Sequence, residues 1–240
     1  EAERRLRNIR LVMARFNGEE LAADVRPQFT VLRARLSPEG VEALLGVSVV
    51  ERVRTPPMPF IEPSDWVART VDDIETDTRD GEPVGVIDDG LADHPLLRDL
   101  IASRRGFPVG HTFEAIGTHG TMVGGLAAYG DFEASLRDDL PLIAGGPVHE
   151  ARVLEPDPDR PTQYRFAPEV TVHEVIEQAI QTLNAEEGVR VFNLSIAERD
   201  AYSGPHVGLV TERLDELIRE LGVVVVVCAG NHAVEPLSAT

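Results

Sequence analysis

The sequence of 240 residues contains no lysine, because all 23 of its basic residues are arginine. This absence excludes chemistries that need a lysine amine: the phosphate-binding lysine of P-loop enzymes, a Schiff base and a serine–lysine dyad. The single cysteine, Cys228, excludes an internal disulfide framework and a cysteine-rich zinc site. No apolar run approaches the roughly 20 residues of a membrane-spanning helix, so we expect no membrane partner.

Positive charge is scarce beside negative charge, since 41 acidic residues give a net charge of −18. A phosphate backbone would repel such a chain, so we expect no nucleic-acid partner, whereas basic peptides are compatible. The imbalance begins near residue 60: residues 1–60 carry a net charge of +2 and residues 61–240 a net charge of −20. This shift indicates a near-neutral N-terminal module before an acidic body. The plainer interpretation is a solvated acidic surface.

The first 57 residues predict a small α+β unit, and the proline- and acid-rich residues 58–83 predict a linker. The predicted elements of the unit are a helix over residues 1–15, a strand over Gln28–Leu36, a short helix begun by Ser37-Pro38-Glu39 and ended by Gly46, and a strand over Val47–Val53.

Residues 84–240 carry the pattern of an α/β domain, with a parallel sheet covered by helices on both faces. The predicted strands are Val84–Ile87, Val189–Leu194 and Val223–Val227, the last expected to be buried, and the predicted helices are His119–Tyr129, Thr171–Leu183 and Val207–Leu221. The 76 positions between His119 and Ser195 indicate an insertion near residues 131–168. Functional groups gather at the carboxyl ends of strands in such sheets.

Three polar residues fall at predicted strand ends or helix starts: Asp88, His119 and Asn231. A carboxylate, an imidazole and a side-chain amide are three of the four parts of an acyl-transfer site. Each residue also has a plainer interpretation. The aspartate and the asparagine could form turns, and the histidine could cap or pack against its helix.

Four segments resemble motifs of the subtilisin-like serine proteases, the subtilases, and occur in that family's order. They are Val86-Ile87-Asp88-Asp89-Gly90 followed by His94-Pro95-Leu96, His119-Gly120-Thr121-Met122-Val123-Gly124-Gly125, Phe192-Asn193-Leu194-Ser195, and Val225-Val226-Val227-Cys228-Ala229-Gly230-Asn231. The resemblance covers about residues 84–232 and implies a subtilisin-like fold and hydrolysis of polypeptide substrates with no required cofactor.

The resemblance also implies roles for individual residues. Asp88 would orient the imidazole, His119 would act as general base and then acid, and Asn231 would donate to the oxyanion. Ser195, Ile196 and Ala197 would pair with the substrate backbone, and Ala229 and Gly230 would line the main specificity pocket. Phe29–Pro57 looks like the second half of a subtilase propeptide, which would make residues 1–57 an intramolecular partner. A generic scaffold or oligomerisation domain is the plainer alternative.

The sequence departs from the family at the nucleophile, because it contains no Gly-Thr-Ser motif and its eight serines lie in other contexts. We therefore expect these 240 residues to be a portion of a protease that lacks the serine segment and is inactive alone. Two alternatives stay open: a catalytically dead, subtilase-like peptide-binding module, and half of a two-chain enzyme. The adjacent Asp89 is expected to point away from Asp88 and to stay solvated, because neighbouring residues on a strand face opposite sides.

Other chemistries fit the sequence less well. A magnesium-dependent phosphoryl-transfer domain built on Asp88-Asp89 would need the missing lysine and leaves His119 unexplained. No pair among His94, His111 and His119 has the i, i+4 spacing of a helical zinc site. The acidic runs at residues 72–77 and 155–159 leave room for structural calcium, although such runs are usually solvated loops.

Overall fold

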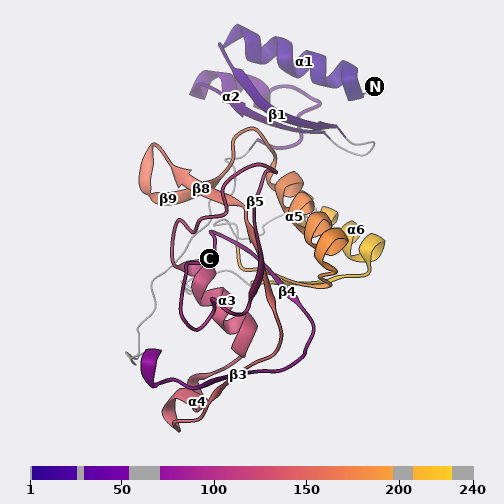
Figure 1. Ribbon diagram of the computed structural model, residues 1–240. Coiled ribbons are helices and arrows are strands. Elements are labelled where there is room, and N and C mark those ends of the chain that lie inside the picture. The colour runs from indigo at the N-terminus through magenta and orange to yellow at the C-terminus, as the bar shows by residue number, and fades with distance from the viewer. Residues whose placement is uncertain (1, 26–29, 54–70, 197–207, 229–240) are drawn as a thin grey trace, which may run out of the picture. The chain divides into compact units, whose positions relative to one another are not determined.

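The computed structural model describes residues 2–25, 30–53, 71–196 and 208–228. The chain divides into two compact units, traced in Figure 1. Unit 1 comprises Glu1–Pro56 with Phe166–Glu174, and unit 2 comprises Pro57–Arg165 with Val175–Thr240. Within the described ranges, no helix combines the length and apolar character that crossing a membrane would require.

Unit 1 begins with helix α1 (Ala2–Arg15), followed by strands β1 (Glu19–Val25) and β2 (Thr30–Arg35) and helix α2 (Pro38–Leu45). The two strands pair antiparallel, with an irregularity in the register after Glu20. Three apolar side chains from the two helices are almost fully buried: Leu6, Met13 and Leu44. These helices therefore supply the small core of the unit.

The structure confirms part of the prediction for this unit and corrects another part. The Ser37 hydroxyl accepts from the Gly40 amide at 3.2 Å, and proline follows it at the start of α2, as predicted. The predicted strand over Val47–Val53 is wrong, because the backbone turns there and the Val50 amide donates to the Val47 carbonyl at 2.8 Å. The partner of β2 is instead β1, whose glutamates and alanines carry little intrinsic strand preference.

Two side chains on the strands of unit 1, Arg33 and Asp24, make polar contacts with its second segment, Phe166–Glu174. The Arg33 guanidinium donates to the carbonyls of Ala167 at 2.6 Å and Val170 at 2.9 Å. The buried Asp24 carboxylate lies 2.5 Å from Nε2 of the buried His173. Unit 1 is thus assembled from parts of the chain more than 130 positions apart.

Unit 2 is built on a five-stranded parallel sheet in the order β11-β10-β4-β7-β5. The strands are β4 (Val84–Asp88), β5 (Ile101–Gly106), β7 (Val148–Arg152), β10 (Val191–Leu194) and β11 (Val224–Val227). The predicted α/β class with a parallel sheet between helices is confirmed. Helix α3 (His119–Tyr129) covers one side of the sheet, and α5 (Val172–Glu187) and α6 (Leu209–Leu221) cover the other (Figure 1).

Apolar packing on both sides holds the sheet between these helices. On the α3 side, Val86 packs in one cluster with Leu91, Leu97 and Ala128. On the other side, α5 buries five side chains almost completely: Val175, Ile176, Ala179, Ile180 and Leu183. Gly85 leaves room for the Phe192 ring of the neighbouring strand β10, because a Cβ at Gly85 would lie 2.6 Å from that ring.

The predicted burial of Val223–Val227 is wrong, although the strand itself forms. Val224, Val226 and Val227 are 56%, 52% and 57% exposed, and only Val223 is buried. Among the described residues, β11 pairs with β10 alone and ends the sheet order. An apolar run therefore predicted a strand correctly, but it could not predict the position of that strand at an edge of the described sheet.

The segment expected to be an insertion contains regular structure. It holds α4 (Glu133–Arg137), β6 (Leu142–Ala144), the sheet strand β7, and the paired strands β8 (Leu154–Asp157) and β9 (Arg160–Phe166). The turn Val71–Asp73 leads to β3 (Thr76–Thr78), which pairs parallel with β6. Strand β7, which lies between β4 and β5 in the sheet, therefore comes from a segment that carried no apolar strand pattern.

Candidate active site

Asp88 and His119 come together where β4 ends and α3 begins. Asp88 is the last residue of β4 and is 1% exposed, and His119 is the first residue of α3 and is partly buried. Nδ1 of His119 lies 2.8 Å from Oδ1 and 3.0 Å from Oδ2 of Asp88. A carboxylate accepts only, so this contact assigns the proton to Nδ1 and leaves Nε2 of the neutral ring as an acceptor.

The charge around His119 favours its protonated form. The hydrogen bond to Asp88 raises the pKa of the imidazole above its usual value, burial opposes this, and the negative charges of Asp88 and Asp89 add to the rise. The ring is thus oriented, and its basicity increased, by the carboxylate behind it. This is the arrangement that a general base needs, since a more basic Nε2 takes up a proton more readily.

Asp89 lies beneath the start of α3, so the expectation that it would stay solvated is wrong. Its side chain is 0% exposed, and its Oδ1 accepts from the Gly120 amide at 2.7 Å. The strand ends at Asp88 and the chain turns through Gly90, which has a φ of 102°, so the alternation of strand faces no longer applies. Burial and then the charge of Asp88 raise the pKa of Asp89 to about 6.

Glu150 is a third buried acid near Asp88 and Asp89, and the sequence analysis did not predict a role for it. It is 1% exposed, and its Oε1 accepts from the Leu91 amide at 3.0 Å. Nη1 of Arg104 lies 3.1 Å from Oε2 of Glu150 and also donates to the Leu91 carbonyl at 2.6 Å. Burial nevertheless raises the pKa of Glu150 to about 7. These contacts fix the loop that follows Gly90.

Glu150→Gln is expected to change how stability depends on pH. The folded-state pKa of Glu150 lies above the unfolded value, so this group stabilises the protein at low pH, and the stabilisation is lost as the pH rises from about 4.5 to about 7. The variant removes that loss, so its unfolding free energy relative to wild type should rise by about 2–3 kcal/mol between pH 4.5 and pH 8. Thermal unfolding at both pH values measures this, with Glu82→Gln at an exposed position as the control. An identical difference at both pH values would contradict the assignment.

The carboxyl ends of three strands meet at the edge that holds Asp88. Ile87 pairs with Leu194, and Leu194 pairs with Val227, so Ser195 and Cys228, which follow β10 and β11, lie level with Asp88, the last residue of β4. The Cys228 amide also donates to the Leu194 carbonyl at 3.4 Å. The register therefore brings the Asp motif, the substrate-strand motif and the chain just before Ala229 to the same edge.

Of the remaining predicted site residues, the structure describes two, Ser195 and Ile196. Ser195 and Ile196 follow β10 and are partly buried, and the Ser195 hydroxyl donates to Oδ1 of Asn193 at 2.9 Å. Ala197, Ala229, Gly230 and Asn231 lie outside the described residues.

A serine–histidine contact, separate from the Asp88–His119 pair, lies on the opposite face of the sheet. Oγ of Ser103 is 2.8 Å from Nδ1 of His149, and Oε2 of Glu187 lies 3.9 Å from the same nitrogen. His149 and Glu150 are neighbours on β7 and so face opposite sides. Burial lowers the pKa of His149. This contact ties β5, β7 and the end of α5 together and is separate from the Asp88–His119 pair.

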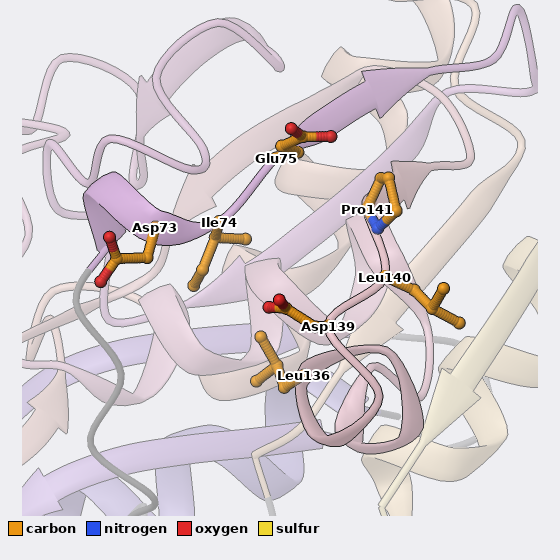
Figure 2. Close-up of a pocket in the computed structure, with 7 residues that line it drawn as sticks. All are labelled: Asp73, Ile74, Glu75, Leu136, Asp139, Leu140 and Pro141. Atoms are coloured by element: carbon orange, nitrogen blue, oxygen red, sulfur yellow. The ribbon is translucent and has the colours of Figure 1, made fainter.

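An acidic pocket forms between the turn before β3 and the end of α4. Figure 2 shows the seven side chains that line it: Asp73, Ile74, Glu75, Leu136, Asp139, Leu140 and Pro141. None of them belongs to β4 or α3, and the three carboxylates point in different directions. In the described part of the chain, no three His, Cys, Asp or Glu side chains lie close enough together to hold a metal ion.

Comparison with known proteins gives a family match over most of unit 2. The model of the subtilase family matches residues 79–239. Two relatives are uncharacterized proteins of Sinorhizobium fredii (strain NBRC 101917 / NGR234). Protein y4kK is 37% identical over 109 residues, which are 42% of this chain and 35% of the relative. Protein y4bN is 42% identical over 58 residues, which are 24% of this chain and 14% of the relative.

The chain thus spans about a third or less of the length of the curated relatives it matches. The family match is broader, because it takes in every strand of the parallel sheet, the helices on both faces, and both members of the Asp88–His119 pair. The chain belongs to the subtilase family of peptidases.

Proposed function

We propose that the complete gene product is a serine endopeptidase of subtilisin type, in which Asp88 orients His119 and His119 is the general base. The observation that carries this proposal is the contact between Nδ1 of His119 and the buried Asp88 carboxylate at 2.8 Å. In a family of peptidases, such a pair at the carboxyl end of the sheet has the geometry needed to activate a hydroxyl nucleophile.

The nucleophile in this proposal is a serine outside the 240 residues, because the sequence lacks a Gly-Thr-Ser motif. Its Oγ attacks the substrate carbonyl carbon as its proton passes to Nε2 of His119. The side-chain amide of Asn231 donates to the oxyanion that forms. His119 then gives the proton to the leaving amine as the C–N bond breaks. Water, deprotonated by the same ring, releases the acyl group and restores the serine.

The other motif residues bind the polypeptide substrate in this proposal. Ser195, Ile196 and Ala197 present a strand edge that pairs with the substrate backbone, and Ala229 and Gly230 form a wall of the main specificity pocket. The alignment of Ser195 and Cys228 at the edge that holds Asp88 supports this assignment. Residues 1–57 act as a propeptide-like intramolecular partner, and the 240 residues alone are inactive.

The test compares the complete gene product with the 240-residue chain on an unfolded protein substrate. The complete protein should hydrolyse peptide bonds, and its kcat/KM should fall on the acid side as His119 becomes protonated, with an apparent pKa above the ordinary histidine value. The 240-residue chain should show no hydrolysis. If the complete protein binds peptides without cleaving them, the alternative of a catalytically dead binding module replaces this proposal. Cleavage that appears only when a second chain is added would instead establish a two-chain enzyme.

A further inference from the structure

Helix α3 lacks a side-chain cap at its N-terminus. Thr118 precedes the helix, but its side chain makes no capping hydrogen bond, and the first turn contains no acidic residue. The first amides of a helix have no partner within the helix, and they carry the positive end of its dipole. A carboxylate from another element can accept a hydrogen bond from such an amide and place a negative charge near the positive end of the dipole. The carboxylate that reaches this helix start is Asp89, through the Gly120 amide at 2.7 Å.

Two glycines make room for this carboxylate. A Cβ at Gly120 would lie 2.7 Å from Oδ1 of Asp89, and a Cβ at Gly117 would lie 2.2 Å from Oδ2. Oδ2 is fully buried and has no hydrogen-bond partner among the residues that the structure describes. The site therefore encloses Asp89 closely, binds one of its oxygens to α3 and leaves the other unbound.

We infer that Asp89 is a positioning residue for His119. Its carboxylate binds the backbone at the start of α3, one residue after His119, and so holds the imidazole against Asp88. Its charge also acts on the ring, at a site where water is excluded. The consequence for catalysis rests on the proposed function, whereas the effect on the ring and on the helix start does not.

The groups around Asp89 support an electrostatic effect as well as a mechanical one. Asp88 from β4, His119 from α3, Glu150 and Arg152 from β7, and Tyr164 from β9 all interact with its charge. The pKa of Asp89 is raised to about 6, so the carboxylate is charged above that pH, where it favours the protonated imidazole. Below that pH, Asp89 takes up a proton and its effect on His119 fades.

The test measures the His119 ring and the Gly120 amide by NMR in the 240-residue chain. Asp89→Asn keeps an oxygen that can accept from Gly120 but removes the charge, so the pKa of His119 should fall by about 0.5–1 unit. Asp89→Ala removes both, so the pKa should also fall and hydrogen exchange at the Gly120 amide should become about tenfold faster or more. Glu150→Gln is the matched control, because it neutralises a buried acid that binds Leu91 rather than α3, and it should leave Gly120 exchange unchanged.

The outcomes separate the inference from the proposed function. A pKa of His119 within about 0.2 unit of wild type in the Asn variant, with the sheet amides still protected, would overturn the charge effect and with it the inference. If the Ala variant fails to fold, the Asn variant decides alone. The measurement needs no hydrolysis. A complete gene product that does not cleave peptides would therefore refute the proposed function and leave the role of Asp89 at the helix start intact.

Discussion

His119→Ala is expected to lower the kcat of the complete gene product by about 10⁶-fold, the loss seen when a subtilase loses its general base. Without the imidazole, the group that accepts the serine proton is gone, and Asp88 does not replace it because that carboxylate is buried behind the ring, on its Nδ1 side. His111→Ala, at an exposed histidine outside the pair, is the matched control and should keep wild-type activity. Steady-state kinetics on one peptide substrate measure both.

Asp88→Asn should cost less, about 10⁴-fold in kcat. The amide can donate to Nδ1 of His119, which places the ring proton on Nε2, and the ring can then no longer accept from the serine. Activity within tenfold of wild type in either the His119 or the Asp88 variant would show that this pair is not the catalytic one.

Gly120→Ala is expected to be severely destabilising, although alanine is ordinarily the better helix former. Its Cβ would lie 2.5 Å from the Gly90 carbonyl oxygen and 3.1 Å from Cβ of Asp88, so helix α3 would have to move away from β4. Overpacking of this kind costs about 3 kcal/mol. The movement would also separate His119 from Asp88 and lower activity beyond the loss of stability.

Gly125→Ala in the same helix is the matched control, because a Cβ there would meet nothing within 4 Å. That substitution should stabilise the protein by up to about 1 kcal/mol, since glycine is costly inside a helix. The free energies of unfolding of Gly120→Ala, Gly125→Ala and wild type, measured with denaturant, test both expectations. Equal effects of the two substitutions would mean that α3 and β4 do not approach each other as closely as described.

The apolar elements of unit 2 could be predicted because apolar side chains occur along them in the pattern of a buried strand or of one buried helix face. Val84–Ile87 and the helical stripe of Thr171–Leu183 indicated a strand and a helix, and the structure has them as β4 and α5. Strand β7 could not be found in this way. It buries His149, Glu150 and Arg152, and polar residues are buried only when distant segments supply partners for them.

The order of the site residues along the chain could be predicted from the sequence. The buried acids that surround them could not. A strand end followed by a helix start pointed to Asp88 and His119, because both positions lie at one edge of a parallel sheet. The contact of Asp89 with Gly120 depends on how the chain turns after β4, and no periodicity encodes that turn. The ion pair of Arg104 with Glu150 joins residues 46 positions apart, so it becomes visible only when β5 and β7 are paired.

The most direct test of the catalytic assignment is fluorophosphonate labelling of the complete gene product, with the modified residue located by mass spectrometry. The probe reacts with an activated serine, so one label should appear on a serine outside the 240 residues and should disappear in His119→Ala. The 240-residue chain should stay unlabelled. A label on Ser195 or Ser103, or labelling that persists without His119, would contradict the assignment of Asp88 and His119 as the pair that activates the nucleophile.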